Sequence, residues 1–214
     1  MADGFHVISG REGARNKDPQ KYQKDAALLE RALNVEQDDF MRTRYVFYLA
    51  QSYRDAGEKE KALANYIRRS QMGHWQEEVY VSLYNAARIE ETLEWPFDTV
   101  LAAYKTAAKA QPERVEALYS ASRMCRVAGR YQEGYELAQK GLQTPFSPGG
   151  LFVEHWIKDY GLLDEFAVNA YWIEEYQDCL AACEQMLSEG KIPDTMKERV
   201  SKNADYAKRK LKAA

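Results

Sequence analysis

The sequence is poor in residues that interrupt helices and in residues that cross-link a chain. Its 214 residues include only six prolines, twelve glycines and three cysteines. Cys125, Cys179 and Cys183 form no CxxC pair, which argues against a disulfide framework or a zinc site of familiar spacing. We expect reduced thiols buried where helices pack. Because Ala, Leu, Glu, Lys, Gln and Arg are abundant, the composition favours an all-α fold.

Long apolar runs and an excess of one charge are also lacking. The sequence has no apolar run of about eighteen residues, and its first residues lack the basic start and apolar stretch of a secretory signal. We therefore expect no membrane span and a cytoplasmic protein. Thirty basic and thirty-three acidic side chains leave a formal net charge of −3, which argues against nucleic acid as a partner.

Residue patterns typical of catalysis are missing as well. The three histidines are far apart and have no cysteine or acid at ligand spacing, so we expect no metal site and no cofactor. They are His6, His74 and His155. The adjacent Asp38 and Asp39 are expected to cap a helix or form a turn. The stretch GREG at 10–13 lacks the GK[ST] ending of a phosphate-binding loop. We predict that this chain alone is not an enzyme.

What the sequence does contain is a recurring two-helix pattern. In each unit an apolar stripe with helical spacing is followed by a turn and a second stripe. The first stripes begin at Val46, Tyr80, Leu118 and Leu163. The intervals between them are 34, 38 and 45 residues. The second interval carries an insertion around residues 93–96, and the third carries its surplus in the Pro/Gly-rich stretch 144–160, which we expect to be a long loop.

A period of about 34 residues is typical of the tetratricopeptide repeat. We therefore predict an all-α, right-handed superhelical solenoid of antiparallel helix pairs spanning residues 18–214, preceded by a connector at 1–17. The predicted parts are a lead-in helix at 18–36, repeats at about 42–72, 76–112, 114–144 and 160–190, and a capping helix at 194–211. Asp18 and Pro19 are expected to open the lead-in helix.

Part of the sequence also resembles a narrower family. Residues 45–55, YVFYLAQSYRD, and 57–91, GEKEKALANYIRRSQMGHWQEEVYVSLYNAARIEE, are similar to the helical repeat region that follows the catalytic domain in bacterial glycosyltransferases of the family 2 type. The leading ISGREGARNKDPQKYQKDAALLERAL resembles the segment that joins those two domains. The resemblance implies an accessory region of such a transferase, without the nucleotide-sugar domain.

A second face of the first helices is predicted to line a concave groove. Side chains one, five and eight residues after the start of each stripe share that face. The candidate binding residues are Phe47, Gln51, Arg54, Asn85, Arg88, Tyr119, Arg123 and Arg126. An arginine recurs at the eighth offset in three units, so the middle of the groove is predicted to be basic. Guanidinium groups match carboxylates and phosphates, which predicts an acidic peptide segment, a phosphate-bearing group or part of an acceptor glycan as ligand.

Two alternatives remain open at this point. The arginines would serve stability alone if each paired with a neighbouring acid such as Asp55 or Glu91. For the whole chain, we predict a non-catalytic binding or scaffold domain that presents its groove to a protein or glycan partner, as the accessory region of a bacterial glycosyltransferase. A free-standing peptide-binding adaptor is the alternative. A third hypothesis is a homodimerisation module that uses the aromatic loops at 95–97 or 145–146.

Overall fold

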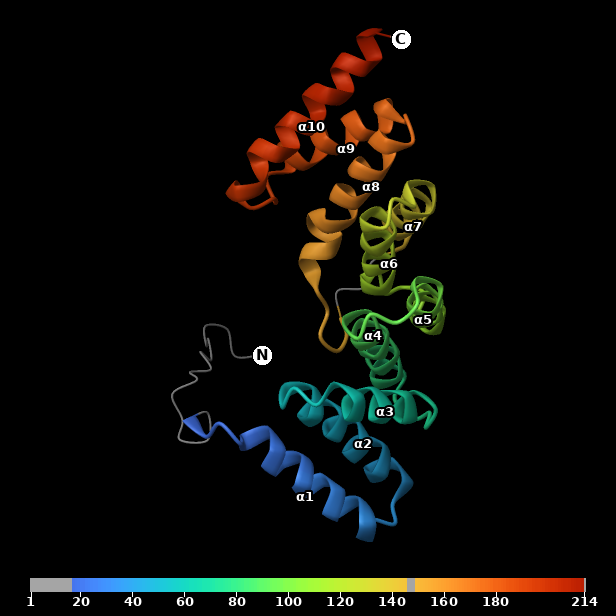
Figure 1. Ribbon diagram of the computed structural model, residues 1–214, viewed down its shortest axis with the longest axis vertical. Coiled ribbons are helices and arrows are strands. Elements are labelled where there is room, and N and C mark those ends of the chain that lie inside the picture. Colours follow the sequence, from blue (N-terminus) through green and yellow to red (C-terminus); the bar gives the residue numbers. More distant parts are fainter. Residues whose placement is uncertain (1–16, 146–148, 214) are drawn as a thin grey trace, which may run out of the picture. The chain divides into compact units, whose positions relative to one another are not determined.

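The computed structural model describes residues 17–145 and 149–213. The chain forms two compact units, Met1–His74 and Trp75–Ala214 (Figure 1). Within the described ranges all the regular elements are helices, which confirms the all-α fold class. Except for Lys17, the predicted connector at 1–17 lies outside the described residues.

The first unit contains α1 (Lys21–Val35), α2 (Asp39–Asp55) and α3 (Lys59–Ser70). Helix α2 packs against both α1 and α3. Small residues allow this close approach, since Ala50 and Ala62 are completely buried. Asp38 caps α2, and its Oδ1 accepts a hydrogen bond from the backbone N–H of Met41 at 2.8 Å. The predicted cap is therefore confirmed for Asp38, and Asp39 is the first residue of the helix.

The predicted start of the lead-in helix was wrong in detail. Asp18 and Pro19 form a turn that precedes α1, because Asp18 Oδ1 accepts from the N–H of Gln20 at 2.9 Å. The carbonyl of Asp18 accepts from the N–H of Lys21 at 3.2 Å. The aspartate thus makes a local side-chain turn, and the helix begins only at Lys21.

The second unit continues the helix pairs. It contains α4 (Gln76–Thr92), α5 (Phe97–Ala110), α6 (Glu116–Val127), α7 (Tyr131–Gln143), α8 (Leu162–Trp172), α9 (Tyr176–Glu189) and α10 (Asp194–Ala213). Each helix packs on the next along the chain, and α6 also contacts α8. Helix α10 lies on α9 and buries Val200, Ala204 and Ala207. Within the described part of the chain, none of the helices combines the length and apolar character that a membrane crossing requires.

Glycines let α7 approach α8 closely. A Cβ at Gly141 would lie 2.7 Å from Cδ2 of Leu162, which is buried. Gly134 likewise faces Asn169, and a Cβ there would collide with the Asn169 amide. Cys125, Cys179 and Cys183 are all buried, so the prediction that they occupy helix-packing positions is confirmed.

The long loop predicted at 144–160 ends earlier than expected. Helical backbone begins at His155, and Ile157–Gly161 forms a π-helix, η2, that leads directly into α8. The aromatic rings of Trp156 and Tyr160 lie 5.7 Å apart in this segment. A Cβ at Gly161 would come within 2.8 Å of the Trp156 ring. Because Gly161 has no side chain, the Trp156 ring can pack directly on the helix backbone. A π-helix does not have the 3.6-residue period of an α-helix, so no apolar stripe in the sequence reveals it.

Candidate functional site

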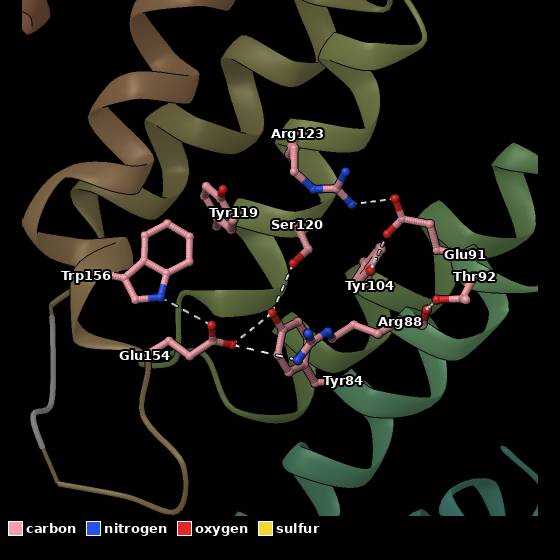
Figure 2. Close-up of a pocket in the computed structure, with 10 residues that line it drawn as sticks. All are labelled: Tyr84, Arg88, Glu91, Thr92, Tyr104, Tyr119, Ser120, Arg123, Glu154 and Trp156. Carbon is pink, nitrogen blue, oxygen red and sulfur yellow. Dashed lines mark hydrogen bonds and ion pairs between the residues drawn. The ribbon is translucent and has the colours of Figure 1, made fainter. Parts of the chain in front are cut away.

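The second unit holds an open pocket of about 490 Å³ bounded by α4, α5, α6 and the residues just before η2 (Figure 2). The lining is rich in aromatic rings and in charged groups of both signs. It consists of Tyr84, Arg88, Glu91, Thr92, Tyr104, Tyr119, Ser120, Arg123, Glu154 and Trp156. Hereafter this is called the pocket.

Helical spacing gathers most of these side chains. Tyr84, Arg88 and Glu91 lie four and three residues apart on α4, so they share one face. Tyr119 and Arg123 are four apart on α6 and face the same space. Side chains from one face of α4 and one face of α6 thereby line the same pocket.

One wall of the pocket is a fixed hydrogen-bonded group. Glu91 Oε1 accepts from Arg123 Nη2, and Glu91 Oε2 accepts from the hydroxyl of Tyr104 at 2.6 Å. Burial raises the pKa of Tyr104 well above its usual range, and the hydrogen bond to Glu91 raises it further. The charge of Arg123 is therefore neutralised by a carboxylate that is itself held in place.

The opposite side is looser. Arg88 Nη1 lies 4.0 Å from Glu154 Oε1, and the Arg88 side chain is 54% exposed. Its guanidinium lies over the ring of Tyr84, 5.4 Å from the ring centroid. Glu154 also accepts hydrogen bonds from the Tyr84 hydroxyl at 3.4 Å and from Trp156 Nε1 at 3.3 Å. Figure 2 shows the Arg88 guanidinium over the Tyr84 ring, with an interaction toward Glu154. Arg88 is thus weakly paired, and its exposure leaves donors accessible to a ligand.

Aromatic rings complete the pocket. Tyr119 and Trp156 make an edge-to-face contact with centroids 5.0 Å apart. Burial raises the pKa of Tyr119 to about 12, and it raises the pKa of Tyr84 still further. Both hydroxyls stay protonated at neutral pH, so they act as hydrogen-bond donors and acceptors rather than as bases. Figure 2 shows the indole of Trp156 on the side of the pocket opposite Arg123 and Glu91.

Glu154 and Trp156 reach the pocket on a segment that we call the strap, residues 149–156. In Figure 1 the loop before α8 runs beside α4. Its backbone is bonded to side chains of other elements: Leu151 N–H donates to Glu77 Oε2 at 3.0 Å, and Glu154 N–H donates to Glu116 Oε1 at 3.3 Å. These bonds fix the strap and place its last residues at the pocket.

A buried arginine anchors the same segment. Arg114 Nη1 contacts Glu77 Oε2 at 2.6 Å, Nη2 contacts Glu116 Oε1 at 2.7 Å, and Nη2 also donates to the carbonyl of Leu151 at 3.2 Å. The Arg114 side chain is only 2% exposed. Burial alone would raise the pKa of Glu116, but the hydrogen bond and charge of Arg114 outweigh it and hold that pKa below its usual value. We call Arg114, Glu77 and Glu116 the latch.

The structure brings three of the predicted groove residues together, namely Arg88, Tyr119 and Arg123. Asn85 is buried and does not line the pocket, and its Nδ2 donates to the carbonyl of Val81 at 2.8 Å. Arg126 lies outside the pocket lining. Its Nε donates to Glu165 Oε2 at 2.7 Å and its Nη2 to Oε1 at 3.1 Å. Arg88 and Arg126, which occupy the same position of their repeats, therefore have quite different surroundings.

The other three predicted residues belong to the first unit. Phe47 is buried, with 1% of its surface exposed. Gln51 lines a separate hollow between α1 and α2. Arg54 Nε donates to Asp55 Oδ1 at 2.8 Å. Within its own unit, Arg54 therefore contacts the acid that the sequence suggested as a partner.

Sequence reasoning missed several members of the pocket. Tyr84 and Tyr104 belong to the apolar stripes of the predicted core. Their rings are buried, but both residues also line the pocket. Glu154 and Trp156 lie in a stretch that the sequence marks only as a loop. No periodic pattern predicts that this loop folds back over α4 and α6. Across the described part of the chain no group of three or more His, Cys, Asp or Glu residues is arranged to hold a metal ion, and His6 lies outside that part.

Comparison with known proteins gives a fold. No protein-family model and no curated protein matches the sequence. A tetratricopeptide repeat protein from Parabacteroides merdae superposes with a TM-score of 0.61 at 16% identity, covering 91% of this chain and 69% of the other. The chain has a tetratricopeptide-like fold. BtubC (BKLC) from P. vanneervenii shares it, with a TM-score of 0.63 at 11% identity over 94% of this chain and 85% of that one. The predicted solenoid class is confirmed, and the glycosyltransferase resemblance stays a prediction.

Proposed function

We propose that this chain is a non-catalytic binding module whose ligand occupies the pocket. The observation that carries the proposal is the state of Arg88, which is 54% exposed and only loosely paired, at 4.0 Å, beside a cavity of about 490 Å³. Cavities of roughly 300–1,000 Å³ are typical of ligand sites. An arginine that is not tightly paired offers its forked donors to a ligand.

The chemistry of the lining supports recognition rather than reaction. Burial raises the pKa of the tyrosines Tyr84, Tyr104 and Tyr119, so none of them is poised to accept a proton. Glu91 is occupied by Arg123 and Tyr104. These groups can donate and accept hydrogen bonds to a bound ligand. We expect the ligand to dissociate without chemical change.

Titration of the purified chain against peptide and oligosaccharide panels tests this proposal. We expect Arg88→Gln to weaken binding of any ligand found. Arg130→Gln is the matched control, because Arg130 is an exposed, ion-paired arginine of the same unit that lies outside the pocket. The mass of each recovered ligand is measured by mass spectrometry to detect any chemical change. Equal affinity in wild type and Arg88→Gln, or a chemically altered ligand, would overturn the proposal.

At the level of the whole protein, the module is proposed to act as the accessory region of a bacterial glycosyltransferase in the cytoplasm, where it presents an acceptor glycan or recruits a protein partner. Support comes from the resemblance of residues 8–33, 45–55 and 57–91 to that family. Sequencing of the reading frame upstream of Met1 tests it. Alternating strand and helix patterns of a nucleotide-sugar domain are expected there, and an in-frame stop codon directly upstream would favour a free-standing peptide-binding adaptor.

Self-association through the loop before α5 is a second candidate function. Trp95 is 42% exposed in this loop, and aromatic side chains are enriched in protein interfaces. Light scattering at several concentrations should then show a dimer that Trp95→Ser converts to a monomer. A mass that stays monomeric at all concentrations would exclude this function. Phe146, in the other loop predicted for dimerisation, lies outside the described residues.

A further inference from the structure

The charge balance of the pocket restricts its ligand. Two arginines, Arg88 and Arg123, face two carboxylates, Glu91 and Glu154. An acidic ligand that paired with Arg88 would bring its charge beside Glu154, whose Oε1 lies 4.0 Å from the same guanidinium. Like charges at that distance repel. The sequence suggested a basic groove, but Glu154 makes this part of it neutral.

Arg88 and Glu154 together match a pair of neighbouring hydroxyl groups. Guanidinium groups only donate hydrogen bonds and carboxylates only accept them, whereas a hydroxyl does both. A ligand with adjacent hydroxyls would accept from Arg88 and donate to Glu154 while leaving their charges balanced. Ser120 adds a further hydroxyl to the same lining, bonded to the Tyr84 hydroxyl at 3.0 Å.

Trp156 supplies an apolar wall next to these polar groups. Trp156 is 37% exposed, and its indole contacts the ring of Tyr119 edge to face, with centroids 5.0 Å apart, and the ring of Tyr160 at 5.7 Å. Its Nε1 donates to Glu154 Oε2 at 3.3 Å, which places the indole directly beside the carboxylate. The carbon-bound hydrogens on one face of a sugar ring pack well against such an aromatic surface.

We propose that the pocket binds a neutral sugar unit, with its ring against Trp156 and adjacent hydroxyls on Arg88 and Glu154. The assignment rests on the proposed binding function and names its ligand class. A neutral polar ring satisfies the aromatic wall, the donor and the acceptor at once. A carboxylate or phosphate would use Arg88 and be repelled by Glu154.

Isothermal titration of the full chain tests the assignment with three probes: neutral gluco-, galacto- and manno-oligosaccharides, the corresponding uronic-acid oligosaccharides, and glutamate-rich hexapeptides. We expect at least one neutral series to bind, and the matching acidic sugars to bind about tenfold or more weakly, an electrostatic penalty of about 1.4 kcal/mol. Tighter binding of the acidic sugars or of the peptides than of every neutral sugar would overturn the assignment.

Variants of the strap sharpen the test. Glu154→Gln should weaken neutral-sugar binding several-fold and strengthen binding of the uronic acids, because the repelling charge is gone. Trp156→Ala should weaken neutral sugars at least tenfold, and Trp156→Phe should restore part of the loss. Trp172→Ala is the control, since Trp172 is 57% exposed and lies outside the pocket. Circular dichroism and thermal unfolding check that each variant folds.

The outcomes separate this assignment from the proposed function. Peptide binding that Arg88→Gln abolishes, without binding of any neutral sugar, would refute the sugar assignment and leave the binding function standing. An acidic-sugar affinity that Glu154→Gln does not change would refute the role of Glu154. No binding of any probe by the folded chain would count against both.

Discussion

Two arginines of the second unit, Arg114 in the latch and Arg88 at the pocket, differ in burial and in how tightly they are paired. The buried arginine is suited to a structural role and the exposed one to ligand recognition. Arg114 is 2% exposed and contacts Glu77 at 2.6 Å and Glu116 at 2.7 Å. Arg88 is 54% exposed and lies 4.0 Å from the carboxylate of Glu154. A buried charge must keep its partners, whereas an exposed ion pair contributes little and exchanges freely. The latch can therefore hold the strap while the pocket stays available to a ligand.

Removal of the latch arginine should have the largest effect on stability. Arg114→Met leaves Glu77 and Glu116 without their buried counter-charge and releases the carbonyl of Leu151. We expect the free energy of unfolding of the second unit to fall by about 3–5 kcal/mol. Urea denaturation followed by circular dichroism measures this. Arg130→Met, which removes an exposed arginine, is the control, and an equal effect of the two variants would contradict a structural latch.

A substitution in the strap should disturb the latch without removing a charge. Gly150 has a φ of +152°, and a Cβ there would lie 3.0 Å from Arg114 Nη1 and 3.0 Å from Glu77 Oε2. Gly150→Ala is therefore expected to cost about 1–3 kcal/mol of unfolding free energy and to weaken ligand binding as Glu154 and Trp156 shift. Gly149→Ala is the control, because a Cβ there meets no atom within 4 Å. Equal stability of the two alanine variants would show that the strap adjusts freely.

The pH dependence of stability should differ in sign between two buried glutamates. Arg114 holds the pKa of Glu116 below its usual value despite the opposing effect of burial. Ionised Glu116 thus stabilises the fold above the pKa of the unfolded chain, and this contribution is lost as pH falls through the lowered pKa. Burial raises the pKa of Glu165, and Arg126 only partly opposes it. The contribution of Glu165 is therefore present in acid and is lost as pH rises through the raised pKa.

Chemical denaturation of Glu116→Gln and Glu165→Gln between about pH 3 and pH 7 checks these signs. The stability difference between wild type and Glu116→Gln should grow as pH rises. The corresponding difference for Glu165→Gln should shrink. If the two stability differences instead changed with pH in the same direction, Arg114 and Arg126 would act on their glutamates in the same way. The latch would then not differ from an ordinary arginine–glutamate pair.

The smallest effect on stability is expected at the pocket. Arg88→Gln removes an exposed arginine that lies 4.0 Å from Glu154, so the unfolding free energy should change by less than about 1 kcal/mol. Ligand affinity should nevertheless fall. Thermal unfolding and titration of the same preparation measure the two effects together. A large loss of stability would instead assign Arg88 to the structural role that the sequence left open.

Several features of the fold could be predicted because they depend on neighbours in sequence. The first residues of the stripes in the second unit, Tyr80, Leu118 and Leu163, are all buried, since helical periodicity alone decides which face turns inward. The capping role of Asp38 was also local. By contrast, the ring of Trp156 packs closely on the backbone of Gly161, the last residue of η2, and a contact between an aromatic ring and the backbone leaves no periodic pattern in the sequence.

The all-α repeat fold and the recurring position of the arginines follow from the amino-acid pattern alone. The role of each arginine depends on how the helices and the strap pack around it. Arg126 meets Glu165 of α8, whereas Arg88 meets the strap. The strap is held by Arg114, whose partners Glu77 and Glu116 lie 37 residues before it and two after it. Long-range pairing of this kind depends on how helices and loops pack. The contribution of a charged side chain to folding stability depends on its burial and its partners, and neither can be read from the residue type alone.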